Sequence, residues 1–471
     1  MGDRITTALK QLQLFFGERD SRQVFVAAGI LFCLLLGVIA VVRAEIPKQV
    51  TERVRYESPV QIDSPYDREA VRHHSSEFNG FRKQAWGTVF EDMDPYRPEE
   101  IHVRAYPPFF NVFFLPFALP WKLTGLGSAL FVLCSLVLGG VGVWSLCGFE
   151  TDAKKRFGLF ALLAMMALPL GLNVLARCET DLFILGPVAV GLAWLSRGKR
   201  PFWAGCLFGF AAALKVLPAL FGIYLLCRKR WSALGGMIAT GLLCTILLPV
   251  LVFGPGRALD LHLSWYRNVV APYHTEGAEA VVGDPARESN QSLAAAAQRY
   301  LRPIAMQPRG YDSTYRMNIA ELSPGAVRDV VKFVQVGIAL LLLLTWVRVR
   351  NPQRSVPTEA ALCGLVAPGI LLLSDVSLTT HHVLLVLPLG ALLARMLVWG
   401  DEYAGRMSWV IVVYLLGLFG VAVPFLKMLT PMLPVTLALL LACILVVWRD
   451  HRRSLTQTTD ADADTVAPPS T

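Results

Sequence analysis

The chain has 471 residues, of which 54% are hydrophobic, and its mean hydropathy of +0.50 excludes an ordinary soluble globular protein. The formal net charge of +9 does not indicate nucleic acid as a partner, because the basic residues lie in short clusters between apolar runs. Those runs have about 17 to 22 residues, enough to cross a bilayer, and they predict an all-α polytopic membrane protein with about 12 membrane helices.

The N-terminal segment begins with residues 1–23, which carry mixed charges and are expected to lie in the cytoplasm. Residues 24–42 form the first predicted span. They are longer than the apolar core of a signal peptide, and no clear small-residue cleavage site follows, so we interpret them as a retained anchor. We therefore predict a single integral-membrane domain over residues 24–448, with its first extracytoplasmic loop at residues 43–125.

The short apolar segment at residues 109–121 decides the orientation of the spans after it. It has about 13 residues, too few to cross a bilayer, and it is interrupted by Pro116 and Pro120. If it crossed, the basic clusters at residues 154–156 and 197–200 would lie outside, against the positive-inside rule. We therefore expect an interfacial helix here and place both clusters in the cytoplasm.

The later spans run between short basic loops that we place in the cytoplasm. They are predicted at residues 127–147, 157–175, 182–195, 233–253, 330–347, 359–373, 383–399, 407–425 and 428–448. A second extracytoplasmic loop is expected at residues 254–328. The tail at residues 449–471 is acidic after Arg453 and contains Thr and Pro, which predicts a disordered cytoplasmic segment. These features indicate a multi-pass protein of the cell membrane with both termini in the cytoplasm.

Residues 202–227 are basic at both ends, although their middle holds Lys215 and Pro218. A lysine at the centre of a single span costs about 2.5–3.5 kcal/mol. We favour two shorter helices that fold back at residues 215–218 and let the lysine face a polar cavity, because broken helices are tolerated where they line one. The alternative is one kinked span with Lys215 extended toward the interface.

Under this topology, polar side chains without an obvious structural role meet on the extracytoplasmic face. They are Glu77, Asp92, Asp94 and Tyr106 from the first loop, Arg177, Glu179, Lys215, His381 and His382 from later turns, and Trp265, Arg267, Asn290 and Gln291 from the second loop. Carboxylates, cations and imidazoles together suit a site that activates a hydroxyl and binds an anion.

Each of these residues also has a structural interpretation. Glu77 could be a solvated carboxylate, Asp94-Pro95-Tyr96 is a good turn signal, and Tyr106-Pro107-Pro108 could set the angle of the following helix. The pair His381-His382 is weak support for a metal, because no further ligand is suitably spaced. The cysteines show no metal-binding spacing, so we predict neither a metal nor a disulfide framework.

Four motifs, in this order, resemble those of one family. They are Glu77-Phe78 with Asp94-Pro95-Tyr96 and Tyr106-Pro107-Pro108, then Lys215-Val216-Leu217-Pro218, then Asn290-Gln291-Ser292-Leu293, and finally Ser374 followed by His381-His382. Their order and spacing are similar to those of glycosyltransferase family 87, the polyprenyl-phosphate-sugar-dependent membrane glycosyltransferases of the C-type superfamily, which include alpha-mannosyltransferases. The resemblance covers roughly residues 24–400.

The resemblance implies a reaction. The donor would be a polyprenyl-phosphate hexose, with mannose the first expectation, and the acceptor would be a hydroxyl of a glycolipid or glycan; no other cofactor is implied. A first-loop carboxylate would deprotonate the acceptor, whose oxygen would then displace the lipid phosphate with inversion. The family uses an aspartate where this chain has Glu77, so Asp63, Asp67, Asp92 and Asp94 stay open as alternatives.

The resemblance also implies roles for the site residues. The catalytic set would be Glu77, Asp94, His381 and His382; the donor phosphate would meet Lys215, Arg177 and Arg267; and the substrates would contact Tyr106, Asn290, Gln291 and Asp92. The residues themselves agree with a lipid-linked donor, because no predicted cytoplasmic loop is large enough to hold a nucleotide-sugar domain.

Two other function classes remain open at this point. A secondary transporter or a flippase of lipid-linked sugars would use the break at Lys215–Pro218 as a midplane site. Against it, no paired halves are visible in the sequence. An O-antigen-ligase-like enzyme would also use a lipid-linked donor, but its chemistry would lie in the second loop.

Overall fold

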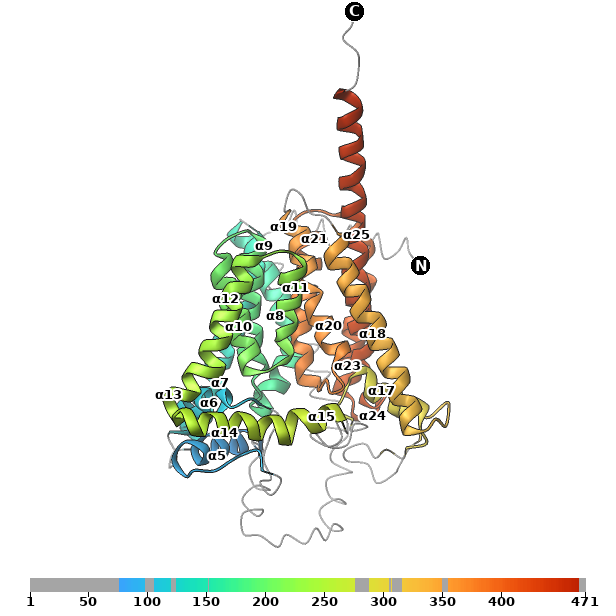
Figure 1. Cartoon of the computed structure of the whole chain (residues 1–471). Coiled ribbons are helices and arrows are strands. Elements are labelled where there is room, and N and C mark those ends of the chain that lie inside the picture. The colour runs from blue at the N-terminus through green and yellow to red at the C-terminus, as the bar shows by residue number, and fades with distance from the viewer. Residues whose placement is uncertain are drawn as a thin grey trace, which may run out of the picture.

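The computed structural model describes residues 76–97, 106–119, 124–150, 152–275, 288–304, 306, 316–349 and 355–465. The first predicted span, residues 24–42, lies outside these ranges. Within them the chain is mostly helical, with no β-strand, and an isolated bridge joins Asn290 and Leu378. Most helices run side by side as one bundle (Figure 1). We call the end that carries α5, α6, α14 and α17 the base; α25 leaves the bundle at the opposite end.

Seven helical segments among the described residues are long and apolar enough to cross a membrane. They are α7 (Thr124–Leu146) with η1 (Cys147–Phe149), α8 (Ala153–Arg177), α12 (Trp231–Leu242) with η3 (Leu243–Leu247) and α13 (Leu248–Phe253), α18 (Pro324–Arg348), α19 (Val356–Gly364) with α20 (Val366–Leu373), η5 (Thr379–Leu385) with α21 (Val386–Leu397), and α25 (Met432–Thr465). The protein is therefore a multi-pass membrane protein, while the total of about 12 membrane helices stays a prediction.

Shorter helices complete the bundle and its base. They are α5 (Ser76–Phe90), α6 (Phe109–Ala118), α9 (Asp181–Ser196), α10 (Pro201–Leu214), η2 (Leu217–Ala219), α11 (Leu220–Cys227), α14 (Pro255–Trp265), η4 (Tyr266–Val270), α15 (Ala271–Thr275), α17 (Leu293–Leu301), α22 (Glu402–Arg406), α23 (Trp409–Ala422) and α24 (Pro424–Lys427). At 10 residues, α6 is roughly 15 Å long, half of a bilayer core, which agrees with the prediction that it does not cross.

The predicted break between residues 202 and 227 is present. Lys215 ends α10 in an extended conformation, and after η2 the chain continues as α11. The stacked rings of Phe208 and Phe221, 4.4 Å apart, join the two halves. Because Pro218 lacks an amide hydrogen, it helps to prevent one continuous helix.

Glycines bring α10 and α12 unusually close together. A Cβ atom on Gly205 would lie 1.7 Å from the carbonyl oxygen of Ala233, and one on Gly209 would lie 2.4 Å from that of Met237. Small residues allow such close approach of membrane helices, where packing replaces the hydrophobic driving force. The contact fixes α10, and therefore Lys215 at its end, against α12.

Aromatic rings join α5 and α6 to the bundle. The rings of Phe81 and Phe110 lie 4.9 Å apart, and Phe114 contacts Phe131 of α7 at 5.4 Å. These side chains are fully buried. The apolar positions of α6 therefore pack into protein, and this part of the first loop is built into the core beside α7.

The second predicted loop contains a long helix that the sequence analysis does not predict. From Pro255 to Thr275, α14, η4 and α15 continue one another across the base (Figure 1). Arg257 donates to the carbonyl oxygen of Thr88 at 2.7 Å and pairs with Asp92. This helix therefore ties the second loop to the first.

The tail differs from the prediction of a disordered segment after residue 448. α25 continues as a helix to Thr465. The physical reason is continuity, because extending an existing helix adds one hydrogen bond per residue without a new nucleation step. The domain boundary at residue 448 stays a prediction.

Candidate active site

A sharp turn at the base places two carboxylates inside the protein. α8 ends at Arg177, and Cys178 takes a left-handed conformation (φ 54°) that closes the helix. Three residues later α9 begins at Asp181, where a carboxylate is favoured by the helix dipole. Glu179 is 3% exposed and Asp181 is 1% exposed, so the turn directs both acidic groups inward.

Lys215 is the partner of Asp181. Its Nζ lies 2.9 Å from Oδ1 of Asp181, and the lysine side chain is only 15% exposed. The pair joins the start of α9 to the end of α10. Pairing is what permits this burial, because either charge alone inside the protein would be strongly unfavourable.

Tyr106 lies against this ion pair. The Lys215 Nζ is 5.9 Å from the centre of the tyrosine ring, and the hydroxyl oxygen is 3.4 Å from Oγ1 of Thr180. Burial raises the pKa of Tyr106 to about 12, against the opposing effect of the Lys215 ammonium. The phenol therefore keeps its proton at neutral pH and acts as a hydrogen-bond donor.

The two histidines reach the same place from η5. His381 and His382 are both buried. Nδ1 of His381 accepts the backbone N–H of Leu378 at 3.2 Å, so a neutral His381 carries its proton on Nε2. Nδ1 of His382 lies 3.0 Å from the carbonyl oxygen of Leu378 and is placed to donate to it.

A threonine fastens η5 to the carboxylate turn. Thr380 donates a short hydrogen bond from Oγ1 to Oε2 of Glu179. Arg177 lies 3.7 Å from the other oxygen of the same carboxylate. The structure therefore brings together four of the predicted site residues, Tyr106, Lys215, His381 and His382, around Glu179 and Asp181, with Arg177 beside them.

This group of side chains also contains the atoms that a metal ion would need. One ligand atom each from Glu179, Asp181 and His381 lies within 4.8 Å of the others. Carboxylate oxygens and an imidazole nitrogen suit several divalent cations. However, Lys215 already brings a positive charge to Asp181, so the group has its own cation. The absence of a metal requirement stays a prediction.

Other predicted residues have different contacts. The carboxylate of Asp94 accepts hydrogen bonds from the backbone N–H of Tyr96 at 3.0 Å and from Oγ of Ser264 at 2.7 Å. Asp92 is exposed and pairs with Arg257. Both join the first loop to α14. Arg267 is exposed on η4.

Glu77 lies in the first turn of α5. Its side chain falls outside what the structure describes, so its role as the base stays a prediction. The neighbouring turn of the same helix brings Phe81 within 5.5 Å of the Tyr106 ring. The backbone of α5 is thus held close to the tyrosine that borders the ion pair.

Asn290 and Gln291 bond mainly to the backbone. Oδ1 of Asn290 accepts the N–H of Ser377 at 3.0 Å, and Nε2 of Gln291 donates to the carbonyl oxygen of Lys427 at 2.9 Å. Arg299 donates to the carbonyl oxygen of Asn290 at 2.8 Å. The first bond holds the second loop on the segment that precedes the histidines, and the second ties it to α24. Contact of either amide with substrate stays a prediction.

Comparison with protein families gives one match. The model of glycosyltransferase family 87 matches residues 105–375, more than half of the chain. The chain belongs to glycosyltransferase family 87. The matched region includes Tyr106, the turn from Arg177 to Asp181, and Lys215, and it ends shortly before the histidines. No curated protein and no solved structure matches this chain.

Membership of family 87 identifies a membrane glycosyltransferase and favours the enzyme over the transporter interpretation. The sequence analysis misses one member of the buried group. It names Arg177 and Glu179 from the turn after α8 but does not propose Asp181 as a site residue. A signal was available, because a lysine buried in a membrane protein needs a nearby carboxylate.

Proposed function

We propose that this enzyme transfers a hexose, with mannose the first candidate, from a polyprenyl-phosphate sugar to a hydroxyl of a glycolipid or glycan. The reaction takes place at the extracytoplasmic face and inverts the anomeric centre. The observation that carries the proposal is Lys215, buried at the break in an apolar helix pair and held there by Asp181 at 2.9 Å. A cation at this position suits the phosphate of a donor whose tail lies in lipid.

The distribution of basic residues supports the side of the membrane. Arg200 precedes α10, Arg228 follows α11 and Arg348 ends α18, all at the end opposite the base. The positive-inside rule puts that end in the cytoplasm. The base, with the buried carboxylates and histidines, then faces outward.

The short connections opposite the base support a lipid-linked donor. Only a few residues separate α9 from α10 and α11 from α12. A nucleotide-sugar domain needs far more chain than these connections offer. Among the described residues, the base has more structure beyond the bundle than these short connections: it carries α5, α6, α14 and α17 (Figure 1).

The chemistry follows from the groups in place. A carboxylate, with Glu77 the first candidate, takes the proton of the acceptor hydroxyl. The acceptor oxygen attacks the anomeric carbon from the face opposite the phosphate, and the bond from that carbon to the phosphate oxygen breaks. The electron pair leaves with the phosphate, where Lys215 and Arg177 stabilise the added negative charge. The products are the new glycoside, the polyprenyl phosphate and a proton on the carboxylate.

Tyr106 and the histidines would orient the substrates. The protonated phenol of Tyr106 and the Nε2–H of His381 are hydrogen-bond donors beside the ion pair. Donors of this kind suit the sugar hydroxyls and the phosphate oxygens. Orienting both substrates lowers the entropic part of the barrier without any change in the chemistry.

The proposal is tested by transfer assays in proteoliposomes with a labelled polyprenyl-phosphate mannose. Lys215→Met and Glu77→Gln should each lower the rate by at least about 100-fold. The matched control is Glu402→Gln, an exposed carboxylate at the start of α22, which should transfer at the normal rate. Full activity of Lys215→Met would contradict the proposal that Lys215 binds the donor phosphate. A product that keeps the donor's anomeric configuration would contradict an inverting reaction.

A further inference from the structure

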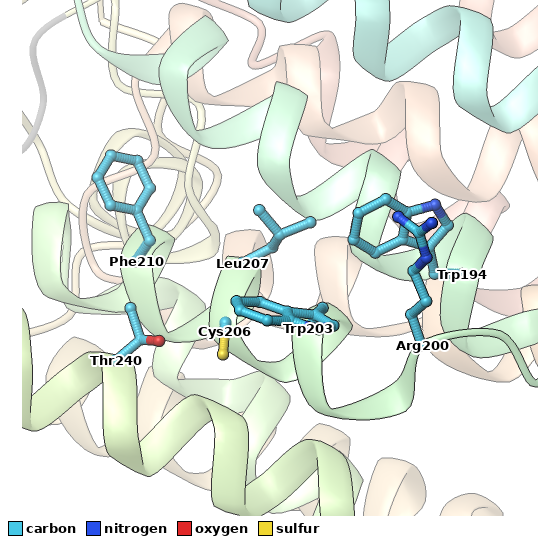
Figure 2. A pocket seen from close by; sticks show the side chains of 7 residues that line it. All are labelled: Trp194, Arg200, Trp203, Cys206, Leu207, Phe210 and Thr240. Atoms are coloured by element: carbon cyan, nitrogen blue, oxygen red, sulfur yellow. The ribbon is translucent and has the colours of Figure 1, made fainter.

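A groove opens on the outer surface of α10, along the helix from Trp203 to Phe210. Its volume is about 510 Å³. Trp203, Cys206, Leu207 and Phe210 of α10 form its floor, and Trp194 of α9 and Thr240 of α12 border it (Figure 2). Nearly the whole lining is apolar, and Arg200 closes one end. A cavity of this size suits one extended hydrocarbon chain.

The floor of the groove follows from the spacing of these residues. Positions 203, 206, 207 and 210 recur at helical intervals and therefore lie on one face of α10. The glycines at positions 205 and 209 are on the face that meets α12. The apolar stripe is therefore turned away from α12; Cys206 and Leu207 are half-buried, and Trp203 is 60% exposed.

Phe210 closes the groove on the side toward α6. Its ring meets those of Phe109 and Phe113 at 6.2 and 5.9 Å. In Figure 2 it lies at one end of the row of side chains, and Arg200 with Trp194 lies at the other. The groove thus has one charged end and one aromatic end.

Arg200 gives the groove its chemical character. It is exposed, it takes a left-handed conformation (φ 47°) before α10, and its guanidinium lies 5.5 Å from the Trp194 ring. Lys199, the preceding residue, is also exposed. A planar guanidinium binds phosphate oxygens in pairs and stacks on aromatic rings at the same time. The positive end therefore complements an anionic headgroup beside an apolar chain.

We propose that this groove binds one anionic phospholipid of the membrane. Its phosphate would lie on Arg200 and one of its acyl chains along the face of α10 from Trp203 to Phe210. Basic pockets between membrane helices bind such headgroups. The occupant differs from the sugar donor, because α10 has 14 residues and holds Arg200 and Lys215 roughly 21 Å apart along the membrane normal.

Native mass spectrometry of the full chain in detergent tests this site. The protein is mixed with phosphatidylglycerol or with phosphatidylcholine of the same chain length. We expect wild type to retain phosphatidylglycerol at least about five-fold better than phosphatidylcholine.

The variants test the two ends of the site separately. Arg200→Gln should remove this preference, and Arg200→Lys should keep part of it. Leu207→Trp, which fills the groove, should reduce retention of both lipids. The matched control is Lys154→Gln, an exposed cation at the same end of the bundle, which should behave as wild type.

Two results would overturn the proposal. One is unchanged phosphatidylglycerol retention in both Arg200→Gln and Leu207→Trp. The other is polyprenyl phosphate that displaces phosphatidylglycerol and is itself lost in Leu207→Trp, which would assign the groove to the donor. Arg200 is exposed, so Arg200→Gln leaves the core intact. Because the assay reads lipid binding alone, it gives its answer even if the proposed transfer reaction fails its own test.

Discussion

Two buried groups of charges lie at opposite ends of the bundle. At the base, the Asp181 group contains Glu179, Asp181, Lys215 and His381. At the other end, the Glu359 group contains Glu359, Tyr224 and two arginines. Glu359 lies 2.8 Å from Arg230 and 3.6 Å from Arg228, and it accepts the Tyr224 hydroxyl at 2.8 Å.

The two groups differ in the kinds of side chain that they contain. In the Glu359 group a single carboxylate is shared by two cations, and Arg228 also donates to the carbonyl oxygen of Val349 at 2.6 Å. These bonds join α11, α18 and α19, and their charges hold helices together. The Asp181 group instead combines two carboxylates, a lysine and an imidazole, next to Tyr106 and α5. Burial of charge is common to both groups, so the mixture of proton donors and acceptors is what favours the Asp181 group as the candidate active site.

The largest effect is expected from breaking the Asp181 group. Asp181→Asn leaves the Lys215 ammonium without its partner, so both activity and stability should fall, transfer by at least about 100-fold. The double variant Asp181→Asn/Lys215→Met removes both charges. Thermal unfolding of the purified protein should recover in the double variant, while transfer should not. Recovery of transfer would show that the pair has only a structural role.

The opposite result is expected for the Glu359 group. Glu359→Gln leaves two arginines with a neutral partner, and the free energy of unfolding should fall by about 3 kcal/mol. The rate per folded molecule should stay within about three-fold of wild type, because the proposed active site lies at the other end of the bundle. Both quantities come from unfolding curves and from transfer assays normalised to folded protein. A large loss of transfer rate with an unchanged free energy of unfolding would contradict the proposed difference between the Glu359 and Asp181 groups.

A third test concerns the contact that fixes Lys215. Gly205→Ala places a Cβ atom 1.7 Å from the Ala233 carbonyl oxygen and should destabilise the protein by about 1–3 kcal/mol. Gly235→Ala is the matched control, because nothing lies within 4 Å of its Cβ. Alanine is the better helix former, so this control should be neutral or slightly more stable. Equal stability of the two variants would argue against the close packing of α10 and α12.

Acid should weaken the charge network around Asp401, which also lies away from the base. Burial alone would raise the pKa of Asp401, but hydrogen bonds from Arg395 and Arg449 outweigh it and lower the pKa to about 2. The pKa is lower in the folded protein than the value of about 4 in the unfolded chain. The ionised Asp401 carboxylate therefore stabilises the folded protein fully above pH 4, and this contribution is lost as the pH falls toward 2. Asp401→Asn should flatten this part of the stability profile.

The smallest effect is expected from removing metal ions. If Lys215 provides the positive charge beside Asp181, transfer should stay within about two-fold of normal after treatment with a strong chelator. Zinc, manganese and magnesium are then added back one at a time. Loss of transfer on chelation, with recovery by one of these ions, would show that Glu179, Asp181 and His381 hold a metal.

Much of the fold could be predicted because the bilayer imposes simple rules. Prolines and length predicted that residues 109–121 do not cross, and basic flanks around Lys215 predicted a broken helix. The structure has α10 ending at Lys215, as predicted; α6 is short, and its place at the interface stays a prediction. The helix from Pro255 to Thr275 was missed, although Ala258 and Leu261 have helical spacing and both are buried. A surface helix among charged residues gives a weaker signal than a membrane span.

The site was only partly predictable because its pairings are long-range. Nothing local in the sequence tells that Lys215 bonds to Asp181, 34 residues earlier, since this depends on how α9 meets α10. The bonds of Asn290 and Gln291 to the backbone of distant segments were not predicted either, and contact of these amides with substrate stays a prediction. A side chain that serves a binding site and one that serves a loop can be identical in sequence.

The close contact between α10 and α12 has a mechanical consequence. At Gly205 and Gly209 there is no room even for a Cβ atom between α10 and the backbone of α12. We therefore expect α10 to move together with α12. The α10 helix has Arg200 at one end and Lys215 at the other. Because the two helices are packed this closely, we expect the residues at both ends of α10 to keep a fixed distance from each other.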